Sequence, residues 1–220
     1  HFAFAGWITQ TLLLLIATRM WPGQPEVAQR KMHRILLYNW ICAIGMLISF
    51  AMQGYGAVSI SFSTLSIVVF AWAAVYLFQW MRQSTPHPAF AWLRAALWYG
   101  LLSTLGTAAL SYMMASHQIT QHGYLAAVYW YLHFQYNGWF FLGGMALFSW
   151  WLSDLPNTPP LPATARRLLI WSCLPAFGLS VLWMDLPLPV YLLVVLAGLA
   201  QVIGWTMLLI HLFKHRLFQQ

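Results

Sequence analysis

Long apolar stretches separated by short turns are the feature that most constrains this chain. Each stretch is about 20 residues long or longer, and about 20 is the length that a helix needs to cross the hydrocarbon core of a bilayer. Only 6% of the 220 residues are charged, against roughly 25% in soluble domains. We therefore predict an all-α, polytopic transmembrane helix bundle of about seven spans, at residues 1–20, 34–53, 57–82, 90–115, 122–152, 166–184 and 188–213.

The turns between these stretches contain residues that interrupt helices. Pro and Gly recur in them, as in WPGQPE at 21–26, QGYG at 53–56 and DLPNTPPLP at 154–162, and such clusters mark turns. No turn is long enough to separate two domains, so we predict a single transmembrane helical domain over residues 1–220. Residue 1 is His and begins an apolar run directly, so we expect this domain to be part of a longer chain.

The ten Lys and Arg residues are distributed unevenly between alternate turns. All ten flank the first, third and fifth turns or follow the last span, whereas residues 54–56, 116–121 and 185–187 contain none. Basic residues are retained on the cytoplasmic side of a membrane, which predicts a periplasmic N-terminus and a cytoplasmic C-terminus. The net charge of +7 then reflects topology and predicts no nucleic-acid partner. The expected partner is the lipid bilayer, and other membrane subunits stay open as further partners.

A histidine lies deep in the fifth predicted span, in the aromatic stretch YWYLHFQYNGWFF at 129–141. His133 follows His122 by 11 residues, which places it roughly 16 Å deeper on the same helix face. Asn137 extends that face at i+4. An ionisable group at this depth is costly and indicates a functional site. The ring is a candidate metal or haem ligand oriented by Asn137, a proton relay, or a hydrogen-bond donor to another helix.

Other polar and small residues suggest further roles. His1 precedes an aromatic pair at the outer end of the first span, and Cys42 and Cys173 are expected to be buried without a disulfide. Small residues allow close helix contact in membranes, so we predict that Gly138, Gly143 and Gly144 face a neighbouring helix. Hydroxyl groups in the third span either bond to their own helix or line a polar path: Ser59, Ser61, Ser63, Thr64 and Ser66.

Several kinds of catalytic site are excluded. The three acidic residues, Glu26, Asp154 and Asp185, all lie in predicted turns, so no carboxylate pair is available inside the spans for acid–base catalysis. No Lys lies within a span to form a retinal Schiff base. There is no Gly-rich phosphate-binding loop and no zinc-protease helix motif.

Three motifs carry a resemblance to a known group of proteins: HFAFAGW at 1–7, QGYGAVSISFSTLSI at 53–67 and YLHFQYNGWFF at 131–141. With them the chain resembles an uncharacterised family of polytopic bacterial membrane proteins. In that family the first motif usually follows a run of histidines, of which His1 is the last and the one present here, and this run is similar to the histidine motif of the NnrS family, whose members contain haem and copper. More distantly, it is similar to the haem–copper oxidase and nitric oxide reductase superfamily. The resemblance implies that His1 and His133 are haem or copper ligands, and His122 is a further candidate metal ligand.

The function expected from this resemblance is that of a haem- or copper-binding redox protein of the bacterial inner membrane, related to nitric oxide or oxygen chemistry. If the chain is an enzyme, it is expected to be an oxidoreductase of haem–copper type. Two other functions remain open. One is a transporter or channel with a polar path through the membrane, and the other is a non-catalytic membrane subunit that scaffolds a partner.

Overall fold

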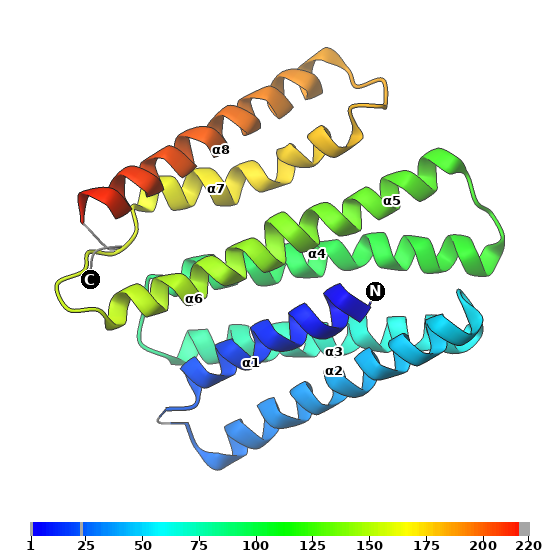
Figure 1. The fold of residues 1–220 in the computed structure, drawn as a ribbon, viewed down its shortest axis with the longest axis horizontal. Helices are drawn as coiled ribbons and strands as arrows, with labels where there is room; N and C mark the ends of the chain where they lie inside the picture. The colour runs from blue at the N-terminus through cyan, green and yellow to red at the C-terminus, as the bar shows by residue number, and fades with distance from the viewer. Residues whose placement is uncertain (1, 23, 216–220) are drawn as a thin grey trace. The chain divides into compact units, whose positions relative to one another are not determined.

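The computed structural model describes residues 2–22 and 24–215, and all of the regular secondary structure in these ranges is helical (Figure 1). The predicted all-α class is therefore confirmed for this part of the chain. Two segments are π-helical, η1 and η2, and η3 is a 3₁₀-helix. In chain order the elements are η1 Phe2–Ile8, α1 Thr9–Met20, α2 Glu26–Gln53, α3 Ala57–Gln83, α4 Ala89–Ser116, α5 Gln121–His133, η2 Phe134–Phe140, α6 Phe141–Asp154, α7 Ala163–Ala176, η3 Phe177–Val181 and α8 Leu188–Lys214.

The helices end at the predicted turns. At the end of α2, Gly54 has a φ of +60°, a left-handed conformation that glycine adopts without steric cost, and its N–H bonds to Phe50 O at 3.0 Å. The largest difference from prediction is the start of α2, at Glu26 instead of residue 34. Glu26 and Arg30 form an i,i+4 ion pair of 2.7 Å. This first part of α2 is polar, so it was not included in a span predicted from apolar residues.

Four helical segments of the described residues are long and apolar enough to cross a membrane: Phe2–Met20, Glu26–Gln53, Ala57–Gln83 and Leu188–Lys214. The other predicted spans also coincide with helix. Of these, α4 has 28 residues, but its Trp, Tyr, Ser and Thr side chains lower its mean hydropathy. The predicted fifth span is a continuous helical path through α5, η2 and α6, and the sixth corresponds to α7 and η3.

Exposed apolar side chains lie along the outside of these helices. On α8, Leu199, Ile203 and Ile210 are each more than half exposed, and their spacing of four and seven residues places them on one helix face. Soluble monomers rarely expose large contiguous apolar patches. A lipid environment explains this surface.

The chain forms two compact units. Unit 1 comprises the residues up to Thr85 together with Thr104–Ala127, and unit 2 comprises Pro86–Ser103 and the residues from Val128 onward. Helices α4 and α5 therefore each contribute one part to each unit. The single domain expected from the sequence remains a prediction.

In unit 1, α2 packs against both α1 and α3 (Figure 1). The buried Asn39 of α2 donates to Gln10 Oε1 of α1 at 2.8 Å. A side chain at Gly6 would collide with Ala43, which shows how closely the start of the chain approaches α2. Small residues and one amide pair thus hold α1 on α2.

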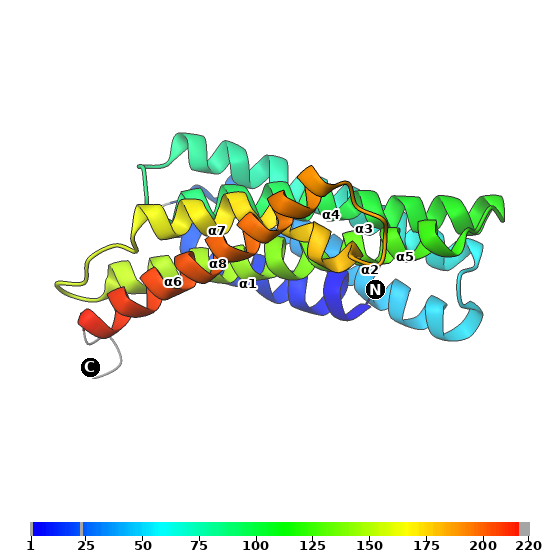
Figure 2. The same ribbon diagram turned by 90° about the horizontal axis from the view of Figure 1, so that it is seen from above.

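In unit 2, α7 lies beside α8, as both views show (Figures 1 and 2). Gly204 of α8 faces Leu169 of α7, and a Cβ atom at Gly178 would collide with Val194. Helix α7 also contacts η2. This contact brings the histidine-containing stretch of the chain against the sixth helical segment.

Candidate functional site

His133 is the last residue of α5, and its side chain lies inside unit 2 with an exposed fraction of 7%. Its Nε2 is 2.8 Å from the carbonyl oxygen of Cys173 in α7. Its Nδ1 is 3.2 Å from Nδ2 of Asn137. A carbonyl oxygen only accepts and an amide nitrogen only donates. This arrangement therefore requires a neutral ring with its proton on Nε2 and its lone pair on Nδ1.

The Cys173 carbonyl can accept this bond because of how α7 ends. In a continuing α-helix, the Phe177 N–H would bond to Cys173 O, four residues back. Here it bonds to the carbonyls of Leu174 and Pro175 as α7 passes into η3. The His133 N–H thus bonds to a carbonyl that the helix itself leaves without its usual partner.

A second bond from outside α7 reaches the same stretch of its backbone. The Tyr99 hydroxyl of α4 donates to Ile170 O at 2.7 Å. Tyr99 also packs on η2 at Gly138, where any Cβ atom would collide with the tyrosine side chain. The predicted close contact at Gly138 is therefore confirmed. For Gly144 the prediction is wrong, because a Cβ atom there would have open space around it, while Gly143 is buried.

Aromatic rings surround the His133 ring. Phe134 and Phe177 meet it edge to face, with ring centroids 5.0 and 5.8 Å away. Trp130 packs against both phenylalanines at 4.8 and 5.0 Å, and its Nε1 donates to Leu102 O at 2.8 Å. The aromatic residues of the motif therefore pack against one another around the imidazole.

Gln135 makes a separate polar contact. Its Oε1 lies 2.8 Å from the Ser103 hydroxyl of α4, which is also 2.7 Å from Gly100 O. Both Gln135 and Ser103 are buried. Ser103, Tyr99 and the Cys173 carbonyl were not predicted as part of the site. For Ser103 and Tyr99, the one signal in the sequence was a polar side chain within an apolar span.

The remaining predicted ligands are not gathered around His133. His1 lies outside the described residues. His122 is the second residue of α5, is exposed and belongs to unit 1. Among residues 2–22 and 24–215, no group of three or more His, Cys, Asp or Glu side chains is placed to hold a metal ion. Cys42 and Cys173 are free and buried, as predicted. Haem and copper binding stay predictions.

The hydroxyl groups of α3 mostly bond to nearby backbone. Ser59 donates to Gly54 O and Gly56 O, and Ser61 and Thr64 each donate four residues back. Ser66 donates to Ser63 O at 2.7 Å. Of the two roles left open by the sequence, bonding to local backbone is the one observed for these four side chains.

Comparison with protein-family models, with curated proteins and with solved structures finds no match to this chain. Its class is therefore given by the fold and the site. Over residues 2–22 and 24–215 it is an all-α protein, with several helices long and apolar enough to cross a membrane. A hydrogen-bonded polar centre in unit 2 joins the end of α5 to α7.

Proposed function

We propose that the chain is a seven-span integral protein of the bacterial inner membrane, with a periplasmic N-terminus and a cytoplasmic C-terminus. Four segments have the length and composition of spans. At 28 residues, α4 is about 42 Å long at 1.5 Å per residue, longer than the roughly 30 Å hydrocarbon core. The seven helical segments alternate in direction in this proposal. The alternation gathers all Lys and Arg residues on the cytoplasmic side.

Within this topology, we propose that the polar centre holds helices together in a non-catalytic membrane subunit. The observation that carries this proposal is the use of both ring nitrogens of His133. One nitrogen bonds to the carbonyl of Cys173 across the helix pair, and the other bonds to Asn137. In lipid, backbone groups must find partners within the protein. His133 supplies one such partner.

Two substitutions at one position test this role. His133→Leu removes the donor and leaves the buried Cys173 carbonyl unpaired, which costs about 1–3 kcal/mol of unfolding free energy. His133→Gln keeps an N–H donor and is expected to recover part of that loss. The measurement is the thermal unfolding midpoint of the purified full-length protein in detergent. Gln121→Leu, which removes an exposed polar side chain from the same helix, is the control and is expected to change little.

A second candidate function, a haem- or copper-binding redox protein related to nitric oxide or oxygen chemistry, is favoured by the direction of the His133 lone pair. The Nε2–H bond to a backbone carbonyl is how metal-binding histidines are commonly oriented. This bond leaves Nδ1 as the atom available to a metal, on the side of the exposed Asn137. A metal there would replace the Asn137 amide, and His1 is the second ligand predicted from the sequence. When bound, the metal would supply electron transfer or gas binding, and His133 would hold it through Nδ1.

Metal analysis and optical spectra of the same variants separate the two functions. A haem absorption band or bound copper that is lost in His133→Gln, at an unchanged unfolding midpoint, supports the metal site. Wild-type protein without iron or copper contradicts that site. If His133→Leu and His133→Gln both have the unfolding midpoint of the wild type, the proposal that His133 holds helices together is wrong.

A further inference from the structure

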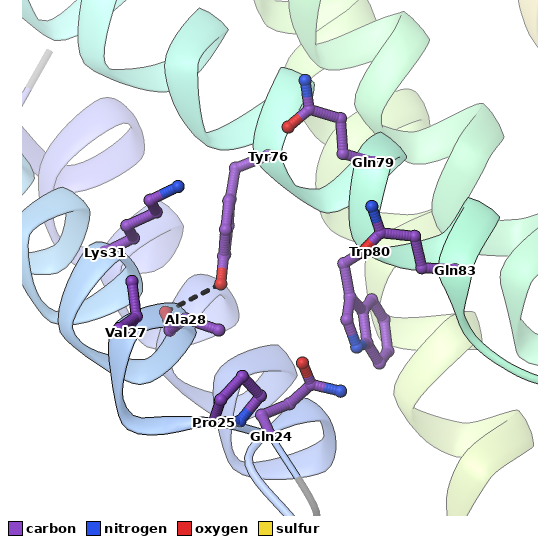
Figure 3. A pocket seen from close by; sticks show the side chains of 9 residues that line it. All are labelled: Gln24, Pro25, Val27, Ala28, Lys31, Tyr76, Gln79, Trp80 and Gln83. Atoms are coloured by element: carbon purple, nitrogen blue, oxygen red, sulfur yellow. Dashed lines mark hydrogen bonds between the residues drawn. The ribbon is translucent and has the colours of Figure 1, made fainter.

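A pocket of about 220 Å³ lies at one end of unit 1, between the start of α2 and the last turns of α3 (Figure 3). This volume is less than the roughly 300–1,000 Å³ of sites for drug-sized ligands. A small group, or the head of a larger molecule, therefore fits it. The pocket is lined by Gln24, Pro25, Val27, Ala28, Lys31, Tyr76, Gln79, Trp80 and Gln83.

Two helices and one turn form the pocket. Tyr76, Gln79, Trp80 and Gln83 have the i, i+3, i+4, i+7 spacing of one face of α3. The Tyr76 hydroxyl donates to Ala28 O at 2.7 Å and ties this face to α2, as Figure 3 shows. The small Ala28 side chain leaves space between the Tyr76 and Trp80 rings.

Residues on either side of position 23 contact the first turns of α2. Gln29 Nε2 donates to Gln24 O at 3.0 Å. Trp21 stacks on His33 of α2, with ring centroids 5.0 Å apart. The bond from Gln29 thus anchors the backbone of Gln24, whose side chain lines the pocket.

The charge of the pocket favours an anion. Lys31 is the only charged residue in the lining, and no carboxylate lines it. The nearest acidic residue in sequence, Glu26, is already paired with Arg30 at 2.7 Å. Arg34 follows Lys31 by one turn of α2, and Arg82 lies in the last turn of α3. This end of unit 1 therefore carries a net positive charge.

We propose that this pocket binds the phosphate headgroup of an anionic phospholipid. A lysine ammonium binds phosphate as a point charge, and the three glutamine amides supply further N–H donors. The pocket lies at the polar ends of two helices long and apolar enough to cross a membrane, where lipid phosphates are concentrated. Basic pockets between spans on the cytoplasmic side bind such headgroups. This inference rests on α2 and α3 as spans and is independent of His133.

The test uses the full chain, purified and delipidated in detergent, and native mass spectrometry to count bound lipid. Phosphatidylglycerol is expected to bind, and phosphatidylcholine with the same acyl chains is not. Lys31→Gln is expected to weaken phosphatidylglycerol binding about tenfold, the size of one lost charge-assisted bond. Ala28→Leu, which fills the space but keeps the charge, is expected to weaken it as well.

Lys214→Gln is the matched control, because it makes the same charge change at an exposed residue at the end of α8 in unit 2. It is expected to bind phosphatidylglycerol like the wild type. Equal binding of the two lipids, or equal losses in Lys31→Gln and Lys214→Gln, would overturn the proposal. Inorganic phosphate or glycerol 3-phosphate binding as tightly as the lipid would overturn it too, in favour of a soluble anion.

Discussion

At the scale of single residues, the side chains of His133 and Tyr99 both bond to backbone carbonyls of α7. His133 could be predicted as a site residue, because a histidine within an apolar span is unusual. Its partner is a backbone carbonyl 40 residues away. Every residue has such a carbonyl, so the sequence does not indicate which one accepts a side-chain hydrogen bond. Tyr99 was missed for the same reason, because its partner is also a carbonyl in α7.

The Tyr99 hydroxyl gives a residue-scale prediction. Tyr99→Phe removes the bond to Ile170 O and leaves the ring, so the unfolding free energy should fall by about 0.5–1.5 kcal/mol, as for a typical hydrogen bond. Chemical unfolding in detergent micelles measures the difference. Tyr112→Phe is the control, since Tyr112 lies on the same helix and is 66% exposed. Equal stability of Tyr99→Phe and wild type would show that the bond contributes nothing.

At the scale of elements, hydropathy and Pro or Gly clusters predicted where helices begin and end. They did not predict the π-helical turns of η1 and η2. A π-helix shifts the backbone hydrogen bonds by one residue and leaves the apolar character of the segment unchanged. The α-to-3₁₀ transition after Ala176 was missed as well, although Pro175 is the kind of residue that disrupts a helix.

The contact between η2 and α4 gives an element-scale prediction. Gly138→Ala would place a Cβ atom into Tyr99, so the helices must shift, at a cost of about 1–3 kcal/mol for an overpacked site. The unfolding midpoint in detergent should fall accordingly. Gly144→Ala, three residues into α6 and with open space around it, should be neutral or slightly stabilising. A Gly138→Ala protein as stable as Gly144→Ala would contradict the close packing.

At the scale of the whole molecule, the sequence predicted an all-helical chain and seven helical segments in the right places. Four of these segments have span-like length and hydropathy among the described residues. Of the others, α5 and η2 contain the polar residues His133, Gln135 and Asn137, and α7 has only 14 residues. The polar residues of the site and the short α7 therefore leave these segments with a weaker membrane signal.

Topology is the prediction at this scale. A reporter fused in the 154–162 turn should be active as a cytoplasmic fusion, and one in the 116–121 turn as a periplasmic fusion. The reason is the ten-to-zero division of Lys and Arg between alternate turns. Paired reporters, one active only in the cytoplasm and one only in the periplasm, supply the control. Two fusions that report the same side would mean that the helices between these turns do not cross as proposed.

The amide pair between Asn39 and Gln10 has a consequence for how the first helices assemble. Helices in lipid gain no hydrophobic free energy from packing on each other, so close packing and hydrogen bonds between them decide how they align. A slip of α2 by one turn would move Asn39 about 5.4 Å along the helix axis and break its hydrogen bond to Gln10. The 2.8 Å bond between them therefore selects one alignment of the α1–α2 pair, and a misaligned pair formed during membrane insertion would be drawn back to it.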